Sequence, residues 1–255
     1  MFHLKTPVEI EYLKKSNQII AKSFNLIRPH MKPGVTTKEI DSIVEDFIRS
    51  KGARPSYKGY SPGRGFKPFP AATCISVNEE VIHGIPGNYV MKEGDIVSVD
   101  IGTELAGFYG DATYNYIIGK TSPEAKALVE HTEKALYLAI DVCREGNYLN
   151  EIGKAISFYL NPLGYGIIRE YCGHGVGKAV HEEPPVLNYY DPKRKGPKFK
   201  KGLVIAIEPM ITMRSPAIAV KSDGWTVVSR DKSLASHWEH SIAITDGEPI
   251  ILSAY

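Results

Sequence analysis

The sequence has few cysteines and no long apolar runs. Its three cysteines, Cys74, Cys143 and Cys172, are odd in number and form no CxxC pair, which argues against a disulfide framework. No stretch approaches the roughly 20 apolar residues of a membrane span. The first residues also lack the apolar core of a signal peptide. We therefore expect a cytoplasmic protein.

The chain also has little excess charge. It carries 31 Lys and Arg against 29 Asp and Glu, a formal net charge of +2, so nothing indicates strong non-specific binding to nucleic acid or to a membrane. A chain of 255 residues with 43% hydrophobic residues can bury a substantial core. Because no segment has the composition of a flexible linker, we expect residues 1–255 to form a single domain.

Apolar spacing predicts an α+β fold. Helical periodicity covers residues 8–28, ending at Pro29, and residues 37–52, ending at Gly52. Residues 57–70 are rich in Gly and Pro and are expected to form an exposed loop. The same criteria predict strands at 73–77, 96–101 and 112–118, helices at 123–143 and 149–160, and strands at 203–207, 226–229 and 241–245.

One pattern occurs twice in the chain. Gly94 opens an apolar run that ends six residues later at Asp100, and Gly202 opens another that ends at Glu208. A charge at the end of a buried strand is costly, so two at matching positions suggest one site built from both halves. The nine-residue spacing between a Cys and a His also recurs, in 74–83 and 172–181. We therefore predict two pseudo-repeated halves, at roughly 7–120 and 121–250.

Five polar side chains are candidates for a metal site: Asp100, Asp111, His174, Glu208 and Glu239. Four carboxylates at one interior point cannot all stay ionised without cations. Two divalent ions would resolve this, and oxygen ligands with one imidazole suit Mn, Fe, Co or Zn. Asp100 ends one predicted strand and Asp111 begins the next, so a hairpin would bring them together. Such a pair of metals, roughly 3.5–4 Å apart, would activate a water for hydrolysis.

Each of these residues also has a plainer interpretation. A single acid at the end of a strand is more often a turn former or a surface group. His174 and His83 lie beside glycines and could be ordinary loop histidines. The cysteines are expected to be small buried hydrophobic residues rather than nucleophiles or ligands.

Several motifs together resemble the methionine aminopeptidases, in particular the bacterial type I form without an N-terminal extension. They follow one another along nearly the whole chain at residues 78–86 (NEEVIHGIP), 94–100 (GDIVSVD), 110–111 (GD), 172–177 (CGHGVG), 181–184 (HEEP), 207–210 (IEPM) and 238–240 (WEH). The resemblance implies a pita-bread fold, in which helices cover a pseudo-twofold-symmetric antiparallel sheet. It also implies a metal-dependent hydrolase that removes the initiator methionine and prefers a small second residue.

The resemblance further implies a role for each site residue. Asp111 and Glu239 would bridge two metals, Asp100 would complete one site, and His174 with Glu208 the other. Glu208 would also take a proton from the attacking water. His83 would contact the reacting amide, and His181 would stabilise the tetrahedral intermediate. The pocket for the methionine side chain would be walled by Cys74, Trp225 and an aromatic such as Tyr60 or Phe69.

The chain departs from the family pattern at two places. Residues 61–68 form an apparent insertion between Gly59-Tyr60 and Phe69-Pro70, and Val180 stands where an aromatic is common. Neither departure affects a ligand, so the chemistry is expected to be intact while the rim of the pocket differs.

Two alternatives to this function stay open. One is an Xaa-Pro aminopeptidase or prolidase of the same fold, and the other is a non-catalytic binding module. For the aminopeptidase we expect a monomer that acts on nascent polypeptides with a transient ribosome contact, and that binds no specific nucleic acid.

Overall fold

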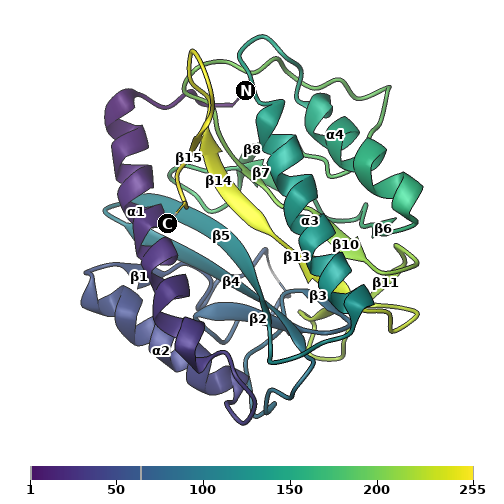
Figure 1. Ribbon diagram of the computed structural model, residues 1–255. Coiled ribbons are helices and arrows are strands. Elements are labelled where there is room, and N and C mark those ends of the chain that lie inside the picture. The colour runs from purple at the N-terminus through teal and green to yellow at the C-terminus, as the bar shows by residue number, and fades with distance from the viewer. Residues whose placement is uncertain (1, 64, 255) are drawn as a thin grey trace.

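The computed structural model describes residues 2–63 and 65–254 (Figure 1). The first half contains α1 Pro7–Ile27, η1 Arg28–His30, α2 Thr37–Ser50, β1 Arg54–Pro55, β2 Thr73–Val77, β3 Glu80–Ile82, β4 Ile96–Leu105 and β5 Phe108–Ile117. The second half contains α3 Pro123–Asp141, α4 Asn150–Leu160, η2 Asn161–Leu163, β6 Gly166–Ile167, β7 Gly173–Gly175, β8 Glu182–Val186, β9 Val204–Ile207, β10 Met210–Thr212, β11 Ile218–Val220, β12 Val227–Ser229, β13 Ala235–His237, β14 Glu239–Ala243 and β15 Ile250–Ile251.

Each long helix in the first half begins at a residue whose side chain caps it. Thr6 caps α1 and Thr36 caps α2, and in both helices a glutamate three residues later bonds back to the threonine backbone. This reciprocal capping box satisfies N–H groups that the first turn of a helix otherwise leaves free. In the second half, Ser122 caps α3, and Pro123 at its first position adopts the helical φ without losing a hydrogen bond.

The longest hairpin of the sheet joins β4 to β5. Ten residue pairs connect the two strands, from Ile96 opposite Ile117 to Leu105 opposite Phe108. The two residues between the strands, Ala106 and Gly107, both have positive φ, at 53° and 82°. A two-residue loop of this kind has the twist that a tight antiparallel hairpin requires.

The main sheet has nine strands, and the order of the strands from the first half of the chain mirrors the order of those from the second half. Its path is β1-β4-β5-β14-β9-β7-β8, with β2 also paired to β4 and β15 to β14, and every pair is antiparallel. From the central pair outwards, β5, β4 and β2 of the first half correspond to β14, β9 and β7 of the second. The predicted α+β class and antiparallel, pseudo-twofold sheet are thus observed.

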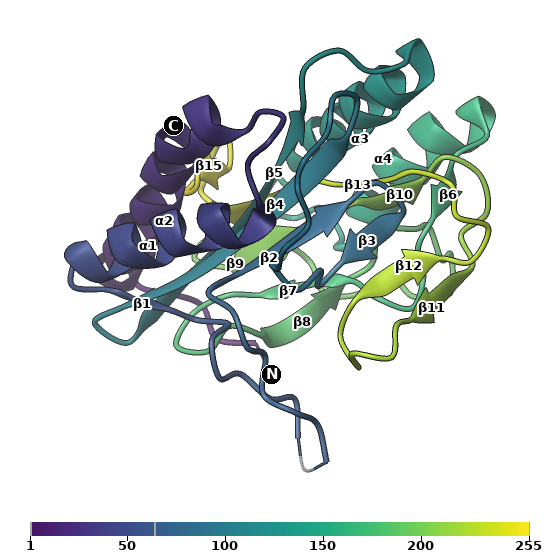
Figure 2. The same cartoon turned by 90° about the horizontal axis from the view of Figure 1, so that it is seen from below.

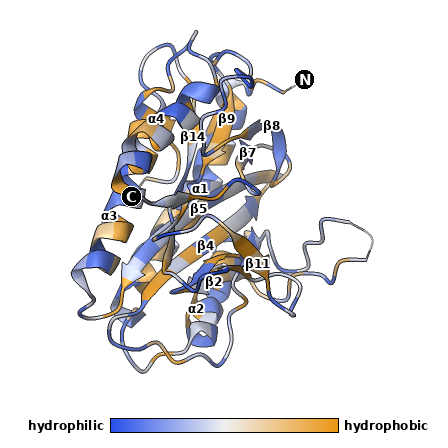
Figure 3. Ribbon diagram, turned by 90° about the vertical axis from the view of Figure 1, so that its right-hand side faces the viewer, coloured by the Kyte–Doolittle hydropathy of each residue, from blue (hydrophilic) through white to orange (hydrophobic). Residues whose placement is uncertain are grey.

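The helices cover one face of this sheet, as the two perpendicular views show (Figure 1, Figure 2). One buried cluster packs α1 and α2 on the first-half strands and includes Phe24, Ile40 and Val99. Another packs α3 and α4 on the second-half strands and includes Leu136, Ile156 and Ile205. Hydropathy colouring shows the alternation along α3 and α4 that such one-sided burial requires (Figure 3). The opposite face of the sheet is left for the site.

The predicted elements agree with the structure apart from some strand boundaries. The strands expected at 96–101 and 112–118 form one hairpin that spans 96–117, and the strand expected at 241–245 begins at Glu239. Short strands such as β7, β10 and β13 were not predicted, because three residues are too few to show a period. Among the described residues, no helix is long and apolar enough to cross a membrane.

Candidate metal centre

The first half of the chain places two carboxylates on the open face of the β4–β5 hairpin. Asp100 lies opposite Thr113, and Asp111 lies opposite Gly102, so the two acids are diagonal neighbours on one face. The Tyr57 hydroxyl lies within hydrogen-bond distance of Oδ1 of Asp100, at 2.6 Å, and of Oδ1 of Asp111. The prediction that a hairpin unites the two acids is correct. Their expected position at strand ends is wrong, because β4 continues past Asp100 to Leu105 and β5 begins before Asp111, at Phe108.

The second half brings three side chains to the same place. His174 lies in β7, Glu208 follows β9 directly, and Glu239 is the first residue of β14. Nε2 of His174 is 3.5 Å from Oε1 of Glu208 and 3.7 Å from Oδ2 of Asp111. Glu239 lies opposite Thr113, whose hydroxyl donates to its Oε2 at 3.0 Å. Strands from both halves therefore supply one cluster.

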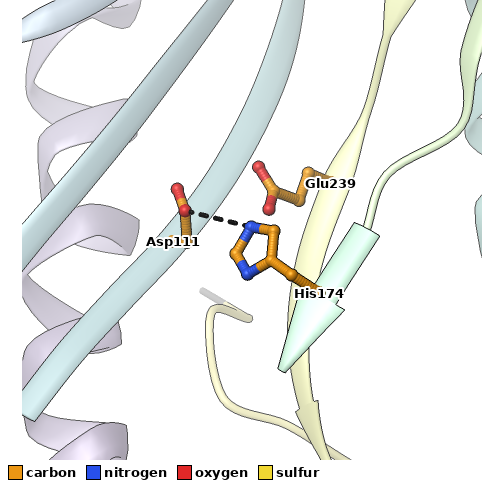
Figure 4. Close-up of side chains that lie close together, drawn as sticks. All are labelled: Asp111, His174 and Glu239. Carbon is orange, nitrogen blue, oxygen red and sulfur yellow. Dashed lines mark ion pairs between the residues drawn. The ribbon is translucent and has the colours of Figure 1, made fainter. Parts of the chain in front are cut away.

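The geometry of this cluster suits a metal ion. One potential ligand atom from each of Asp111, His174 and Glu239 lies within 4.8 Å of the others, and all three residues are buried (Figure 4). Oε1 of Glu239 is buried without a hydrogen-bond partner in the described part of the chain. An unpaired buried carboxylate oxygen is costly unless a cation occupies the space beside it.

The electrostatics of the cluster favour the same conclusion. Burial raises the pKa of Asp100 to about 7. Burial, followed by repulsion from the neighbouring carboxylates, raises the pKa of Asp111, Glu208 and Glu239 well above the usual range. Burial lowers the pKa of His174 to about 3, so its imidazole is neutral and can act as a ligand. Burial and mutual repulsion disfavour the simultaneous ionisation of these four carboxyl groups. Bound divalent cations would stabilise each of them as an anion.

Both predicted catalytic histidines line the same cavity as this cluster. The His181 ring packs edge-on to His174 with centroids 4.4 Å apart, and its Nδ1 lies 3.1 Å from the Tyr60 hydroxyl. His83 has a positive φ of 58°, and its ring packs edge-on against Tyr171 and Trp225. Burial lowers the pKa of His83 to about 4, so the ring is neutral near pH 7.

An apolar pocket adjoins the carboxylates. Cys74 and Phe69 are buried at its wall, and the Phe69 and Trp225 rings pack edge-on with centroids 5.2 Å apart. Burial raises the pKa of the Cys74 thiol well above its usual value, so this side chain is a neutral part of the wall. One cavity of about 440 Å³ is lined by every predicted site residue: Tyr60, Phe69, Cys74, His83, Asp100, Asp111, His174, His181, Glu208, Trp225 and Glu239.

Two further residues of the site were not predicted from the sequence. Tyr57 bonds to Asp100 and Asp111, and no spacing distinguishes it from the other tyrosines. Nε2 of His237 is 3.7 Å from Oε2 of Glu208, and the residue is buried. His237 lies two residues before Glu239, so the two-residue alternation of strands was the one signal that could have found it.

Comparison with known proteins identifies the family. The profile of metallopeptidase family M24 matches residues 11–246. The chain belongs to this family. As a metallopeptidase with a buried cluster of ligand side chains, it is a hydrolase that uses divalent metal.

Within family M24 the chain is most clearly related to methionine aminopeptidases. It is 46% identical over 250 residues to the methionine aminopeptidase of Borreliella burgdorferi, covering 98% of this chain and 97% of the relative. It is 43% identical to methionine aminopeptidase 1 of Bacillus subtilis, over 96% of each chain. The crystal structure of the Thermotoga maritima methionine aminopeptidase covers 100% of both chains with a TM-score of 0.95 and 39% identity. The family and the fold that the motifs predicted are therefore confirmed.

Less similar solved structures share the fold. The Xaa-Pro dipeptidase of Bacillus anthracis has a TM-score of 0.76 at 24% identity, and this chain spans 62% of its length. Such a likeness carries no information on substrate.

Proposed function

We propose that this chain removes the initiator methionine from nascent proteins and peptides, with preference for a small second residue. The observation that carries the proposal is a single cavity that joins five potential metal ligands, two neutral histidines and an apolar pocket. The methionine aminopeptidases to which the chain is 46% and 43% identical support the same activity.

In this proposal, two divalent ions, chosen from Mn, Fe, Co and Zn, bind between the halves. Asp111 and Glu239 would contribute to both sites, Asp100 would complete one, and His174 with Glu208 would complete the other. When bound, the ions supply a Lewis acid for the substrate carbonyl and lower the pKa of a water molecule. Each aspartate and glutamate contributes negative charge at a position where burial disfavours an anion without such a partner.

The remaining steps belong to the protein side chains. Glu208 accepts a proton from the attacking water, because its carboxyl group lines the same cavity as the other ligand side chains. When the Tyr60 hydroxyl donates to Nδ1 of His181, the proton of the ring is on Nε2, where it can be donated to the oxyanion of the tetrahedral intermediate. His83, neutral in its buried position, contacts the reacting amide.

The apolar wall accounts for methionine recognition. An unbranched thioether fits an apolar pocket with soft and aromatic contacts, which Cys74, Tyr60, Phe69 and Trp225 supply. A small second residue follows from the same geometry, because a bulky one would clash with the walls that enclose methionine. We further infer that residues 1–255 act as one catalytic domain of two halves, as a cytoplasmic monomer with transient ribosome contact.

The test is a peptide panel. The purified protein is stripped with a chelator, reconstituted separately with Mn, Fe, Co or Zn, and assayed on Met-Ala-Ser, Met-Leu-Ser, Leu-Ala-Ser and Ala-Pro-Ser. We expect rapid release of methionine from Met-Ala-Ser and little cleavage of the others. Preferential cleavage of Ala-Pro-Ser would favour the Xaa-Pro peptidase, and no cleavage together with no metal binding would favour a binding module.

A further inference from the structure

Residues 61–63 and 65–68 belong to a loop between β1 and β2 that projects from the face of the sheet opposite the helices (Figure 2, Figure 3). Its base is closed by backbone hydrogen bonds. The Phe69 N–H donates to the Tyr60 carbonyl, and the Gly59 N–H donates to the Phe69 carbonyl, both at 2.8 Å. Because Tyr60 also contacts His181, the loop begins at the wall of the catalytic cavity.

The C-terminal side of the loop is hydrogen-bonded to Trp225, on another side of the cavity. The indole N–H of Trp225 donates to the Lys67 carbonyl at 3.0 Å, which joins the loop to the segment between β11 and β12. The Ser61 hydroxyl lies within hydrogen-bond distance of the Gly63 and Phe66 carbonyls, at 3.0 and 3.3 Å. Phe66, on this loop, lines the cavity.

The mouth of the cavity is apolar on both sides. Phe66 and Pro62 line it from the loop, and Val220 at the end of β11 lines it from the other half of the chain. Phe66 is 58% exposed and Val220 is 53% exposed. A single exposed apolar side chain is common. Two from distant parts of the sequence, on the rim of one substrate cavity, form an apolar surface that a ligand can cover.

We propose that Phe66, Pro62 and Val220 form a subsite for an apolar side chain of the substrate, at its third or fourth residue. This inference rests on the proposed aminopeptidase function. The deep apolar wall then holds the methionine side chain, and the carboxylate cluster faces the scissile bond. The rest of the bound peptide therefore extends out of the cavity past its apolar rim. An extended peptide turns alternate side chains to one side, so one of these two residues faces the apolar rim.

This subsite predicts a preference beyond the second residue. A half-exposed subsite discriminates between side chains less strongly than a closed pocket does. We therefore expect kcat/KM to be roughly three- to tenfold higher for a peptide with leucine at this position than for one with serine. Aspartate should be no better than serine, because the three lining residues offer it no cationic partner. The preference should appear at one of the two positions, since alternate side chains point away from each other.

The experiment compares kcat/KM for Met-Ala-Xaa-Ser and Met-Ala-Ser-Xaa, with Xaa as Leu, Ser or Asp. The leucine-to-serine ratio should fall toward one in Phe66→Ser and in Val220→Ser, and should persist in Phe66→Leu. Phe158→Ser is the matched control, because Phe158 is an aromatic of similar exposure, at 62%, on α4. Thermal unfolding of each variant checks that it is folded.

Two results would overturn the subsite. One is an equal rate for leucine and serine at both positions in the wild-type enzyme. The other is a preference that survives both Phe66→Ser and Val220→Ser. The proposed function fails in a different way, through the absence of cleavage of every Met-Ala peptide after metal reconstitution.

Discussion

Glu208 combines two properties that a proton acceptor in this site needs. Its carboxyl group lines the substrate cavity beside the other acids, and its Oε1 lies 3.5 Å from Nε2 of His174. We expect Glu208→Gln to lower kcat on Met-Ala-Ser by about 10²–10⁴-fold, the usual effect of losing general base catalysis, and to weaken metal binding as well. Steady-state assays at saturating metal would measure the loss.

Glu248→Gln provides the control for this substitution. Glu248 is highly exposed and contacts Arg144, so the same change there should leave turnover near that of the wild type. Turnover of Glu208→Gln equal to that of Glu248→Gln would remove Glu208 from the proposed role.

Tyr57 orients the carboxylates of the first half. Its hydroxyl lies within hydrogen-bond distance of both Asp100 and Asp111, and the loss of such a partner commonly changes metal affinity by about 10- to 100-fold. We therefore expect Tyr57→Phe to weaken metal affinity by about this factor, measured by competition with a chelator. Tyr12→Phe, at a half-exposed tyrosine stacked on Phe108, should bind metal as the wild type does. Identical affinities in the two variants would contradict the role of Tyr57.

Some site residues can be predicted from the sequence and others cannot. Seven of the eleven predicted site residues are acids and histidines, which are chemically conspicuous at the ends of apolar runs and in family motifs, whereas Cys74, Tyr60, Phe69 and Trp225 were predicted from the resemblance alone. Tyr57 and His237 were missed because their roles arise from three-dimensional contacts with Asp100, Asp111 and Glu208. A tyrosine in a loop and a histidine in a three-residue strand have no distinctive pattern of their own.

Local sequence determines the helices more strongly than the short strands. The capping box of α1 illustrates this, since Thr6 and Glu9 satisfy the first turn through bonds between residues three apart. The bond from the Thr6 backbone N–H is the main cause that lowers the pKa of Glu9 from 4.5 to about 2. By contrast, strands such as β7 and β10 exist only because they pair with β9 and β13, which no local pattern reveals.

The lowered pKa of Glu9 gives a pH dependence of known sign. A carboxyl with a depressed pKa in the folded state stabilises the protein fully above its unfolded value of 4.5, and this contribution is lost as the pH falls toward 2. The destabilisation caused by Glu9→Gln should therefore be largest at pH 7 and should shrink between pH 4.5 and pH 3. Urea unfolding at several pH values measures it.

The control for this element is Glu11→Gln, an exposed position on the same helix. Its effect on the free energy of unfolding should be small at every pH. A Glu9→Gln effect that stays constant down to pH 3 would show that the capping interaction does not depend on the charge of Glu9.

In the whole molecule, the candidate metal centre joins the two halves. β5 and β14 pair at the middle of the sheet, and ligand side chains come from β4 and β5 on one side and from β7, Glu208 and β14 on the other. A metal that binds only the folded state adds stability according to its concentration, about 2.7 kcal/mol at 100 times its dissociation constant. We expect calorimetry to show one unfolding transition that moves to higher temperature as a whole when metal is added.

Asp111→Asn should abolish most of this shift, since Asp111 belongs to the cluster of three ligand residues. Asp46→Asn, at an exposed position on α2, should retain it. Two separate transitions, with only one of them dependent on metal, would contradict a single domain held together by the centre.

The central claim is that a metal held between the halves makes this chain remove an N-terminal methionine. The most direct measurement follows free methionine released from Met-Ala-Ser by mass spectrometry, with the chelated protein and after stepwise addition of each metal. We expect no release from the chelated protein and release that rises with metal until the site is saturated. Full activity of protein shown to be free of metal, or no release at any metal concentration, would contradict the claim.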